Sequence, residues 1–549
     1  PGRFGPQTSA DLVIKQGVIG GEYSFVTARG SHLIKGGALV EHYKDDLYNP
    51  TFSLGIYTFG NLEGFLRNTP TRFIGLTPEA SLFRLWNFTL MGAYLQDQYR
   101  VSDRLSVQAG LRWEMTTLPK DVEGRDSTLV TLSDTAPTLG QPYGSSPKLN
   151  FSPRVSFAWD VKGDGKLAVR GGYGLYFNVN NQQNLIVTIT NPPVTPRAVI
   201  ANPTFPDPPF ARGIANTIRP VQWDLQNPRA HVFNMNVQKE FWGNTVLTVG
   251  YAGSVGKHLL RSGDVNVPTP ELRSDGTVFY SATGTRPNTA FTVIEQKTSD
   301  GESWYNAGIF DLRHTTGSLR LQASYTLAEA IDTTQASTFF SDATNGTTSA
   351  FPEPHGIEYN KGPADFNATH NLVLTGTWNF LDNWQVSMIG RYRSGNPLTA
   401  FVANNRSRSR WSPSLGPGLG FDRPSLAPGR TAESAVTGNP DQWFDPTAFV
   451  LQPAGTLGNS ERGQFTGPDL RTVDLSLVRF FSLKSLSERG RLEFRIEAFN
   501  IFNRANFGVP ALLAFTGAAD NEAPLSTFGR IRTTVTSSRQ IQLGLRVNF

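Results

Sequence analysis

The chain has 549 residues, of which 38% are hydrophobic, 11% aromatic and 17% charged, against roughly 25% charged residues in a typical soluble domain. Because the sequence has no cysteine, disulfide frameworks, thiolate metal sites and cysteine nucleophiles are excluded. The formal net charge of +5 is small for this length and the basic residues are dispersed, so we expect no nucleic-acid partner.

The dominant pattern along the chain is an alternation of apolar and polar residues, and no run of about 18 apolar residues predicts a membrane-spanning helix. Successive side chains of a strand point to opposite faces, so each run predicts a strand with one apolar and one polar face. Runs of about nine to eleven residues match tilted strands that cross a bilayer, whereas strands of soluble sandwiches usually have about five or six. In chain order, the predicted apolar faces are Leu105, Val107, Ala109, Leu111 and Trp113; Leu167, Val169, Tyr173, Leu175 and Phe177; Leu319, Leu321, Ala323, Tyr325 and Leu327; Leu372, Leu374, Trp378 and Phe380; Trp384, Val386, Met388 and Tyr392; Leu492, Phe494, Ile496 and Ala498; and Ile541, Leu543, Leu545, Val547 and Phe549.

The polar faces of these runs are predicted to line the lumen of a barrel. In the run at 491–497, Arg and Glu alternate two residues apart, and we interpret them as structural ion pairs of the wall rather than a substrate path. Aromatic residues near the run ends are typical of the girdles at a membrane–water boundary. The lumen-facing candidates are Arg104, Arg112, Arg320, Arg491, Glu493, Arg495 and Glu497.

The connections between runs fall into two classes. Tight turns are predicted at residues 102–103, 160–165, 242–244, 314–317, 381–383 and, somewhat longer, 482–490. Long polar excursions rich in Pro, Gly, Ser, Thr and Asn are predicted at about 116–151, 179–230, 256–303, 329–369, 395–470 and 504–537.

Turns and excursions alternate, so every long excursion lies on one side of the sheet. Outer-membrane barrels have this asymmetry, with short periplasmic turns and long extracellular loops. Only helices or closed sheets satisfy their backbone polar groups in lipid. We therefore predict an all-β fold, a transmembrane antiparallel β-barrel with roughly 16–18 strands in this chain.

Motifs for chemistry are sparse. No zinc-protease motif, phosphate-binding glycine loop or nucleophile elbow occurs, so we predict no catalytic, cofactor or metal site and no enzymatic activity. His355, Glu358, Asp365 and His370 gather in one stretch, which we interpret as a polar loop leading into a strand. The cluster of Arg406, Arg408 and Arg410 is likewise interpreted as a solvated loop.

Several segments, scattered from about residue 30 to the end, occur in a characteristic order and spacing. They are YLQDQYRVSDRLSVQAGLRWE (94–114), FSPRVSFAWDVKGDGKLAVRGGYGLYFN (151–178), LRLQASYTLAEAID (319–332), GPADFNATH (362–370), QWFDPTAF (442–449), LGNSERG (457–463), TVDLSLVRFF (472–481) and RLEFRIEAFNIFNRANFG (491–508). Together they resemble the Oar-like, carboxypeptidase-regulatory-like-domain-containing TonB-dependent receptors of the outer membrane, and their order and spacing make the resemblance fairly specific.

This resemblance implies a 22-stranded barrel with an N-terminal plug and a TonB box. It therefore implies that residues 1–549 are the C-terminal barrel portion, with plug and regulatory-like domain outside this sequence. Leu545, Val547 and Phe549 resemble the C-terminal signal that the barrel-assembly machinery reads. The other implied partners are outer-membrane lipid, an extracellular ligand and a TonB complex acting through the N-terminal region.

The expected function is a receptor and transporter of the bacterial outer membrane, with TonB-energised uptake of a siderophore, saccharide, peptide or similar ligand. A passive, porin-like channel is an alternative, and it predicts steady ion conductance in planar bilayers. An outer-membrane adhesin or enzyme is a further alternative, and an enzyme requires paired acidic or His groups at the barrel mouth.

Overall fold

The computed structural model describes residues 11–144, 146–179, 185–212, 214–242, 244–334, 357–409, 422–483 and 490–548. Within these ranges, no helix is both long and apolar enough to cross a bilayer. Strands dominate, and the helical elements are short: α1 (Leu62–Leu66), η1 (Ile186–Thr190), η2 (Phe210–Arg212), η3 (Ile357–Asn360) and η4 (Pro446–Ala448).

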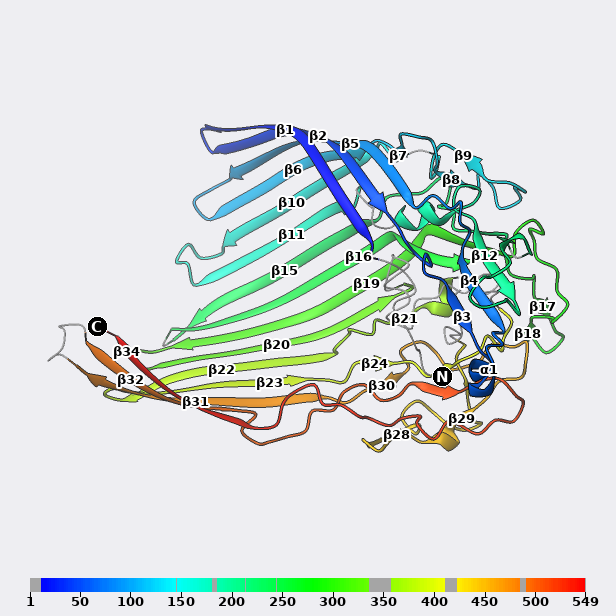
Figure 1. Cartoon of the computed structure of the whole chain (residues 1–549). Coiled ribbons are helices and arrows are strands. Elements are labelled where there is room, and N and C mark those ends of the chain that lie inside the picture. Colours follow the sequence, from blue (N-terminus) through cyan, green and yellow to red (C-terminus); the bar gives the residue numbers. More distant parts are fainter. Residues whose placement is uncertain are drawn as a thin grey trace.

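An 18-stranded sheet forms the body of the described chain, and it confirms the predicted all-β antiparallel barrel wall (Figure 1). Each long strand pairs antiparallel with the next long strand along the chain. Short strands β7 (Lys120–Asp121), β14 (Thr217–Ile218) and β21 (Gly362–Pro363) join it at the loop end. The long strands are β1 (Val13–Arg29), β2 (His32–Tyr48), β5 (Phe83–Arg100), β6 (Leu105–Thr116), β10 (Asn150–Asp160), β11 (Leu167–Phe177), β15 (Arg229–Phe241), β16 (Thr245–Asp264), β19 (Val293–Thr315), β20 (Leu319–Asp332), β22 (His370–Leu381), β23 (Trp384–Arg393), β31 (Leu470–Ser482), β32 (Arg491–Phe499) and β34 (Gln540–Asn548).

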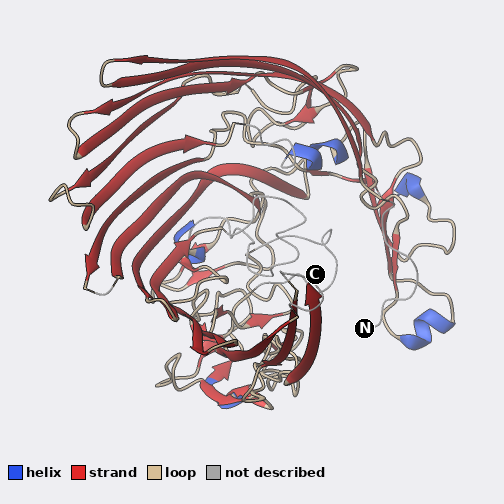
Figure 2. Ribbon diagram, turned by 90° about the vertical axis from the view of Figure 1, so that its left-hand side faces the viewer, coloured by secondary structure: helices blue, strands red, loops and turns tan. Residues whose placement is uncertain are grey.

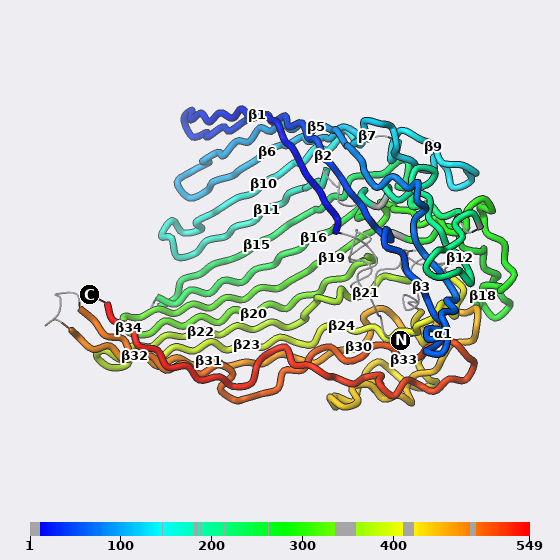
Figure 3. The backbone as a smooth tube through the Cα atoms, in the orientation of Figure 1, coloured from blue at the N-terminus to red at the C-terminus, as the bar shows by residue number. Residues whose placement is uncertain are grey.

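The sheet curves into a wall around an inner space, as Figure 2 shows with the turn end of the wall facing the viewer. Among the described residues, no ladder joins β34 to β1, so each is an edge strand that pairs on one side. The tight turns gather at one end of the wall and the long loops at the other (Figure 3). The predicted separation of short turns from long loops is therefore confirmed.

The predicted turns lie between strands that pair as hairpins, although most of the turn at 482–490 is outside the described residues. A glycine explains one of these turns. Gly165 has a φ of +72°, a conformation that glycine adopts at little cost, and it closes the β10–β11 turn. The sequence prediction did not identify the first hairpin, β1–β2, because Gly17, Gly20, Gly36 and Gly37 replace side chains that would mark its two faces.

The predicted excursion at 256–303 is partly wrong. β16 continues to Asp264 and β19 begins at Val293, and their ladder runs out to the pair Asp264–Glu295 after a bulge near His258. Loops pack over this part of the hairpin, where Leu260 and Lys297 are each 2% exposed. Its faces are therefore not divided into a lipid side and a water side, and no alternation marks it. The predicted excursion therefore contains about equal parts of strand and connection.

The apolar face of the wall, here called the outer face, exposes large apolar side chains, as a lipid-facing surface does. Met235 in β15 is 52% exposed and Leu321 in β20 is 46% exposed. A loop-side belt of polar-tipped rings marks one boundary, where the Tyr173 and Tyr325 hydroxyls lie 2.8 and 2.7 Å from Nδ1 of His231 and His370. A turn-side belt marks the other, and it contains Trp378, Phe380, Trp384 and Phe481. These two belts correspond to the girdles of a membrane barrel.

The described parts of several long loops fold into small sheets. The largest has the order β13-β12-β4-β3, and two-stranded ladders lie within the segments 116–151, 256–303, 395–470 and 504–537. Their strands are β3 (Ile56–Thr58), β4 (Arg72–Leu76), β8 (Ser127–Thr128), β9 (Thr138–Leu139), β12 (Arg197–Ala201), β13 (Ile214–Ala215), β17 (Glu271–Leu272), β18 (Val278–Phe279), β24 (Pro397–Leu398), β25 (Phe401–Val402), β26 (Ser425–Leu426), β27 (Val436–Asn439), β28 (Gln442–Phe444), β29 (Phe449–Val450), β30 (Phe465–Thr466) and β33 (Leu513–Phe515).

Candidate functional site at the loop-side end

The predicted lumen-facing residues form one cluster and several separate sites. In β32, Arg495 Nε donates to Glu493 at 3.0 Å and Arg495 Nη1 lies 3.4 Å from Glu497. The Arg491 guanidinium lies 3.4 Å from the centroid of the Phe480 ring on the same face. This strand therefore carries a continuous charged row on its inner face.

The other candidates lie apart from that row. Arg112 Nη2 donates to Glu114 at 2.6 Å in β6, and Arg320 is exposed near the start of β20. Arg104 precedes β6, at the turn end of the wall, and borders an open cavity of about 560 Å³. These residues do not converge on one substrate path.

The predicted C-terminal signal lies partly within the described chain. Leu545 and Val547 are on the outer face of β34 and are 69% and 41% exposed. Phe549 lies outside the described residues.

A buried core at the loop-side end was not predicted from the sequence. We call it the first loop core, and most of its members come from loops that fold over the inner face of the wall. Trp86, on the inner face of β5, is 1% exposed beneath them. The members are Leu47, Trp86, Tyr143, Leu185, Ile186, Ile189, Val221, Leu225 and Leu260.

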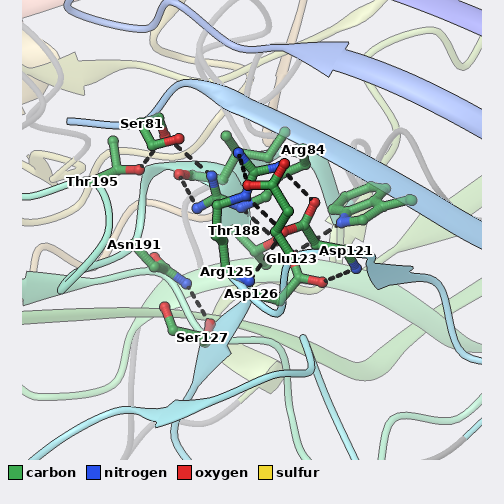
Figure 4. A network of polar contacts seen from close by, with 12 residues as sticks. Ser81, Arg84, Asp121, Glu123, Arg125, Asp126, Ser127, Thr188, Asn191 and Thr195 are labelled. Atoms are coloured by element: carbon green, nitrogen blue, oxygen red, sulfur yellow. Dashed lines mark hydrogen bonds and ion pairs between the residues drawn. The ribbon is translucent and has the colours of Figure 1, made fainter.

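A polar network extends this core and fixes three loops to β5 (Figure 4). The Arg84 and Asp126 side chains have no exposed surface, and Arg84 Nε lies 3.7 Å from Asp126 Oδ1. Arg84 Nη2 also donates to the Ile189 carbonyl at 3.1 Å, and Trp86 Nε1 donates to Asp126 Oδ1 at 3.0 Å. Charged groups without solvent contact are stable only when paired and hydrogen-bonded, so these contacts hold the loops in one arrangement.

Two carboxylates of this network have opposite pKa shifts. Burial raises the pKa of Asp126, although Trp86 and Arg84 favour its ionised form. Burial would also raise the pKa of Asp121, but hydrogen bonds from Arg125 and from the Leu85 N–H outweigh it and lower the pKa. Asp121 accepts from Arg125 Nε at 2.7 Å and from Nη2 at 2.9 Å, the bidentate geometry that gives the strongest such pairs.

A second loop core joins the segments 395–469 and 504–537. Its centre is Phe444, which has no exposed surface and contacts the rings of Phe449, Phe465 and Phe528 at centroid distances of 4.9–5.8 Å. The members are Leu398, Ala400, Val402, Ala435, Phe444, Ala448, Phe449, Phe465, Ala514, Phe515 and Phe528.

The neck of this core is a close backbone crossing. A Cβ atom at Gly395 would lie 1.8 Å from the Gly467 carbonyl oxygen, so only glycine fits there.

The predicted solvated loop at Arg406 and Arg408 is wrong for the described part. The Arg406 side chain is 8% exposed, donates to the Gln452 carbonyl at 2.7 Å and pairs with Asp520. Arg410 lies outside the described residues.

An anion-binding turn closes the second loop core. The Glu522 carboxylate accepts from the Thr516 hydroxyl and from the N–H groups of Gly517, Ala518 and Ala519 at 2.7–2.9 Å. Burial alone would raise the pKa of Glu522, but these donors, led by Thr516, lower it from 4.5 to about 2.

Glu522 should therefore stabilise this turn above about pH 4.5, and the stabilisation should be lost as the pH falls through about 2. Replacing Thr516 with valine removes one donor, so the titration midpoint of Glu522 should move up toward 4.5. The measurement is the pH dependence of the Glu522 carboxyl ¹³C chemical shift in detergent micelles. Thr437→Val, in a neighbouring loop, is the control, and an unchanged midpoint in Thr516→Val would contradict the assignment.

The connection between β16 and β19 contains a pocket of about 480 Å³. Its walls are mainly apolar, and they include Val265, Pro268 and Pro270. Arg261, Asp264 and Gln296 supply polar groups at one side. Apolar walls with a few polar groups are typical of small-molecule sites.

Metal-binding groups do not gather in the described part of the chain, where no set of three His, Asp or Glu side chains could hold an ion. His370 lies on the outer face against Tyr325, whereas Glu358 pairs with Lys361 at 3.2 Å. His355 is outside the described residues.

One feature of the sequence could have predicted a buried core among the loops. The segment 442–449 places Trp443, Phe444 and Phe449 within a stretch that otherwise has loop composition. Large aromatic residues in a solvated loop are costly, so such a cluster indicates a local core. The Arg84–Asp126 pair had no such signal, because its partners are 42 positions apart in sequence.

Comparison with known proteins gives a family and a fold. A family model described as an outer membrane beta barrel domain matches residues 4–542. Among curated proteins, none matches the chain. The outer membrane transporter YddB of Escherichia coli is similar in structure, with a TM-score of 0.50 and 10% identity over 97% of this chain and 54% of that one.

Two further solved structures have lower scores. The FrpB iron transporter of Neisseria meningitidis has a TM-score of 0.45 and 12% identity, and covers 97% of this chain and 55% of its own. The siderophore receptor PirA of Acinetobacter baumannii has a TM-score of 0.47, 12% identity and the same coverages. The chain thus spans about half the length of the solved structures that it matches.

Proposed function

Because the chain belongs to the family of outer membrane beta barrel domains, and is thus located in the bacterial outer membrane, we propose that it forms the wall and the ligand-capturing loops of an uptake receptor. In this proposal a TonB complex supplies the energy through an N-terminal region, the protein is of the Oar-like kind, and it has no catalytic activity. The ligand is a siderophore, saccharide, peptide or similar molecule captured from outside the cell.

The observation that carries the proposal is that buried contacts hold the loops at the loop-side end in one arrangement. The buried Arg84–Asp126 network and the first loop core fix several loops over the inner face of the wall. A capture site benefits from such preorganisation, since loops already ordered lose little entropy on binding. A passive channel needs an open lumen instead, and loops folded over the inner wall oppose it.

The likeness of the fold to that of the E. coli transporter YddB supports a transport role. The pocket between β16 and β19 is our candidate for the first ligand contact, because it combines apolar walls with Arg261 and Asp264. Arg261 holds Asp300 with two bonds of 2.6 Å, which keeps its guanidinium at the pocket.

The test uses cells that produce the whole protein. They are given a labelled ferric hydroxamate, a ferric catecholate, a maltodextrin or an oligopeptide, with and without a protonophore. We expect protein-dependent uptake of one probe that stops when the proton-motive force collapses, while surface binding persists. Uptake that continues would favour a passive channel and overturn energised transport.

Matched variants connect the result with the pocket. Arg261→Met should weaken surface binding of that probe, because it removes the guanidinium from the pocket. The variant should still fold, because Asp300 is half exposed and tolerates the loss of its partner. Arg273→Met is the control, since Arg273 lies on the Phe279 ring in the same loop but does not line the pocket. Equal binding by both variants would argue against this pocket.

A further inference from the structure

A buried arginine of the four-stranded loop sheet β13-β12-β4-β3 has no ion pair among the described residues. Arg197 begins β12, which lies at the loop end of the molecule (Figure 1), and it is 4% exposed. Its Nε atom is buried without a hydrogen-bond partner. The described contact of its guanidinium is the face of the Phe52 ring, with Cζ 5.0 Å from the ring centroid. An aromatic ring attracts a cation but does not replace the hydrogen bonds of a buried donor.

A second buried arginine adds positive charge at this place. Arg219 follows β14, and its Nε donates to the Glu295 carboxylate of β19 at 3.0 Å. The two side chains of this pair are 5% and 13% exposed. The one carboxylate therefore balances one of the two guanidinium groups, and the charge of Arg197 is left without compensation.

The electrostatics of Arg197 agree with an uncompensated charge. Burial lowers the pKa of Arg197 most, the charge of Arg219 lowers it further, and Glu295 opposes both effects. A guanidinium keeps its proton in proteins, so it cannot relieve a buried charge by deprotonation as a lysine can. Buried charges are stable only when they are paired and hydrogen-bonded. The site therefore requires a negative group that the described part of the chain does not supply.

Other contacts fix the two arginines in place. Asn191 has no exposed surface, and it accepts from the Arg219 N–H at 2.7 Å and donates to the Arg219 carbonyl at 3.0 Å. Asn191 directly follows η1, which contributes Ile186 and Ile189 to the first loop core. Arg197 is held by the ladder between β12 and β4. An anion bound by both arginines would thus join the four-stranded loop sheet to the first loop core.

We propose that Arg197 and Arg219 bind a small oxyanion, a phosphate or a carboxylate, inside the loop-side end. The planar donors of a guanidinium match the oxygens of these groups, and two arginines can hold one such group together. Each arginine is 4% exposed, so the occupant is a small group enclosed by the loops. The pocket between β16 and β19 is a separate site, because its lining does not include Arg197, Arg219 or Glu295.

The test is hydrogen exchange of the whole protein in detergent micelles, in inorganic phosphate, acetate or chloride at equal ionic strength. Phosphate or acetate should slow exchange in 72–76 and 197–201 relative to chloride, and the more effective of the two identifies the chemistry of the ligand. At about ten times its dissociation constant, a ligand that binds only the closed loops slows exchange through their local opening about tenfold.

Matched variants assign this effect to Arg197. Arg197→Met should abolish the response to both oxyanions. In chloride the same variant should keep its protection, because it removes an uncompensated buried charge. Arg67→Met is the control, since it removes a positive charge from the loop that supplies β4, but from a side chain that is 72% exposed and paired with Glu63.

A further variant tests the charge balance in the opposite direction. Glu295→Gln removes the carboxylate that competes for Arg219, so the oxyanion concentration that gives half of the effect should fall. Equal exchange in all three salts, a response that persists in Arg197→Met, or a half-effect concentration that does not fall in Glu295→Gln would each overturn the proposal. Heat-modifiable migration on gels establishes that each variant is folded.

Discussion

Replacing Phe444 with alanine should destabilise the second loop core by about 3–5 kcal/mol, the range measured for large aromatic residues removed from packed interiors. Phe444 has no exposed surface and lies stacked on Phe528 at 4.9 Å, so the cavity would be bordered by rings that cannot all move in. Because the barrel wall does not depend on this core, the sheet should remain intact while the loops open.

Hydrogen exchange followed by mass spectrometry distinguishes the two parts. Exchange should accelerate in 425–450 and 511–529 and stay unchanged in β22 and β23. Phe366→Ala is the control, because Phe366 is 65% exposed and its removal should change stability by less than about 0.5 kcal/mol. Loss of protection along the wall strands as well would contradict the separation of loop core and wall.

Placing an arginine at Met235 should lower the stability of the protein in lipid by about 2–4 kcal/mol, the cost of a cation on the lipid face near the bilayer midplane. Met235 lies in the middle of β15, four residues after His231 of the loop-side belt and six residues before Phe241 at the turn end. A charge at this depth is far from both boundaries.

The neighbouring position supplies a matched control. Asn234 points to the opposite face of β15 and pairs with Gly172 and Ala252, so Asn234→Arg has space in a wet lumen and should cost little. Urea unfolding of the protein in phospholipid vesicles measures both. Equal costs for the two variants, or a larger cost for Asn234→Arg, would mean that the outer face has been misassigned.

The wall could be predicted from the sequence because a bilayer imposes a rule on every second residue. In β20, the alternation of Leu319, Leu321 and Ala323 with polar neighbours indicates both the strand and its outer face. The alternation is lost where the strand does not lie between lipid and the wet lumen. At the loop-side end of β16, loops cover the strand, as the 2% exposure of Leu260 and the 8% exposure of Asp264 show, and the alternation disappears although the ladder continues.

The loop-side end could not be predicted in the same way, because its contacts join residues far apart along the chain. Arg84 meets Asp126 and Ile189, and nothing near Arg84 in sequence distinguishes it from the arginines of the lumen wall. The same is true of Arg504, whose partner Asp469 is 35 positions away in the sequence.

The second loop core determines which loop segments have to be transferred together to another barrel. Its rings come from both sides of the hairpin β31–β32, with Phe444, Phe449 and Phe465 on one segment and Phe515 and Phe528 on the other. A graft of 395–469 alone onto another barrel would expose a hydrophobic patch that the second segment normally covers. Such a patch promotes association with other copies of the protein. The two segments must therefore be exchanged, shortened or diversified as a pair, so variation in one of them requires compensation in the other.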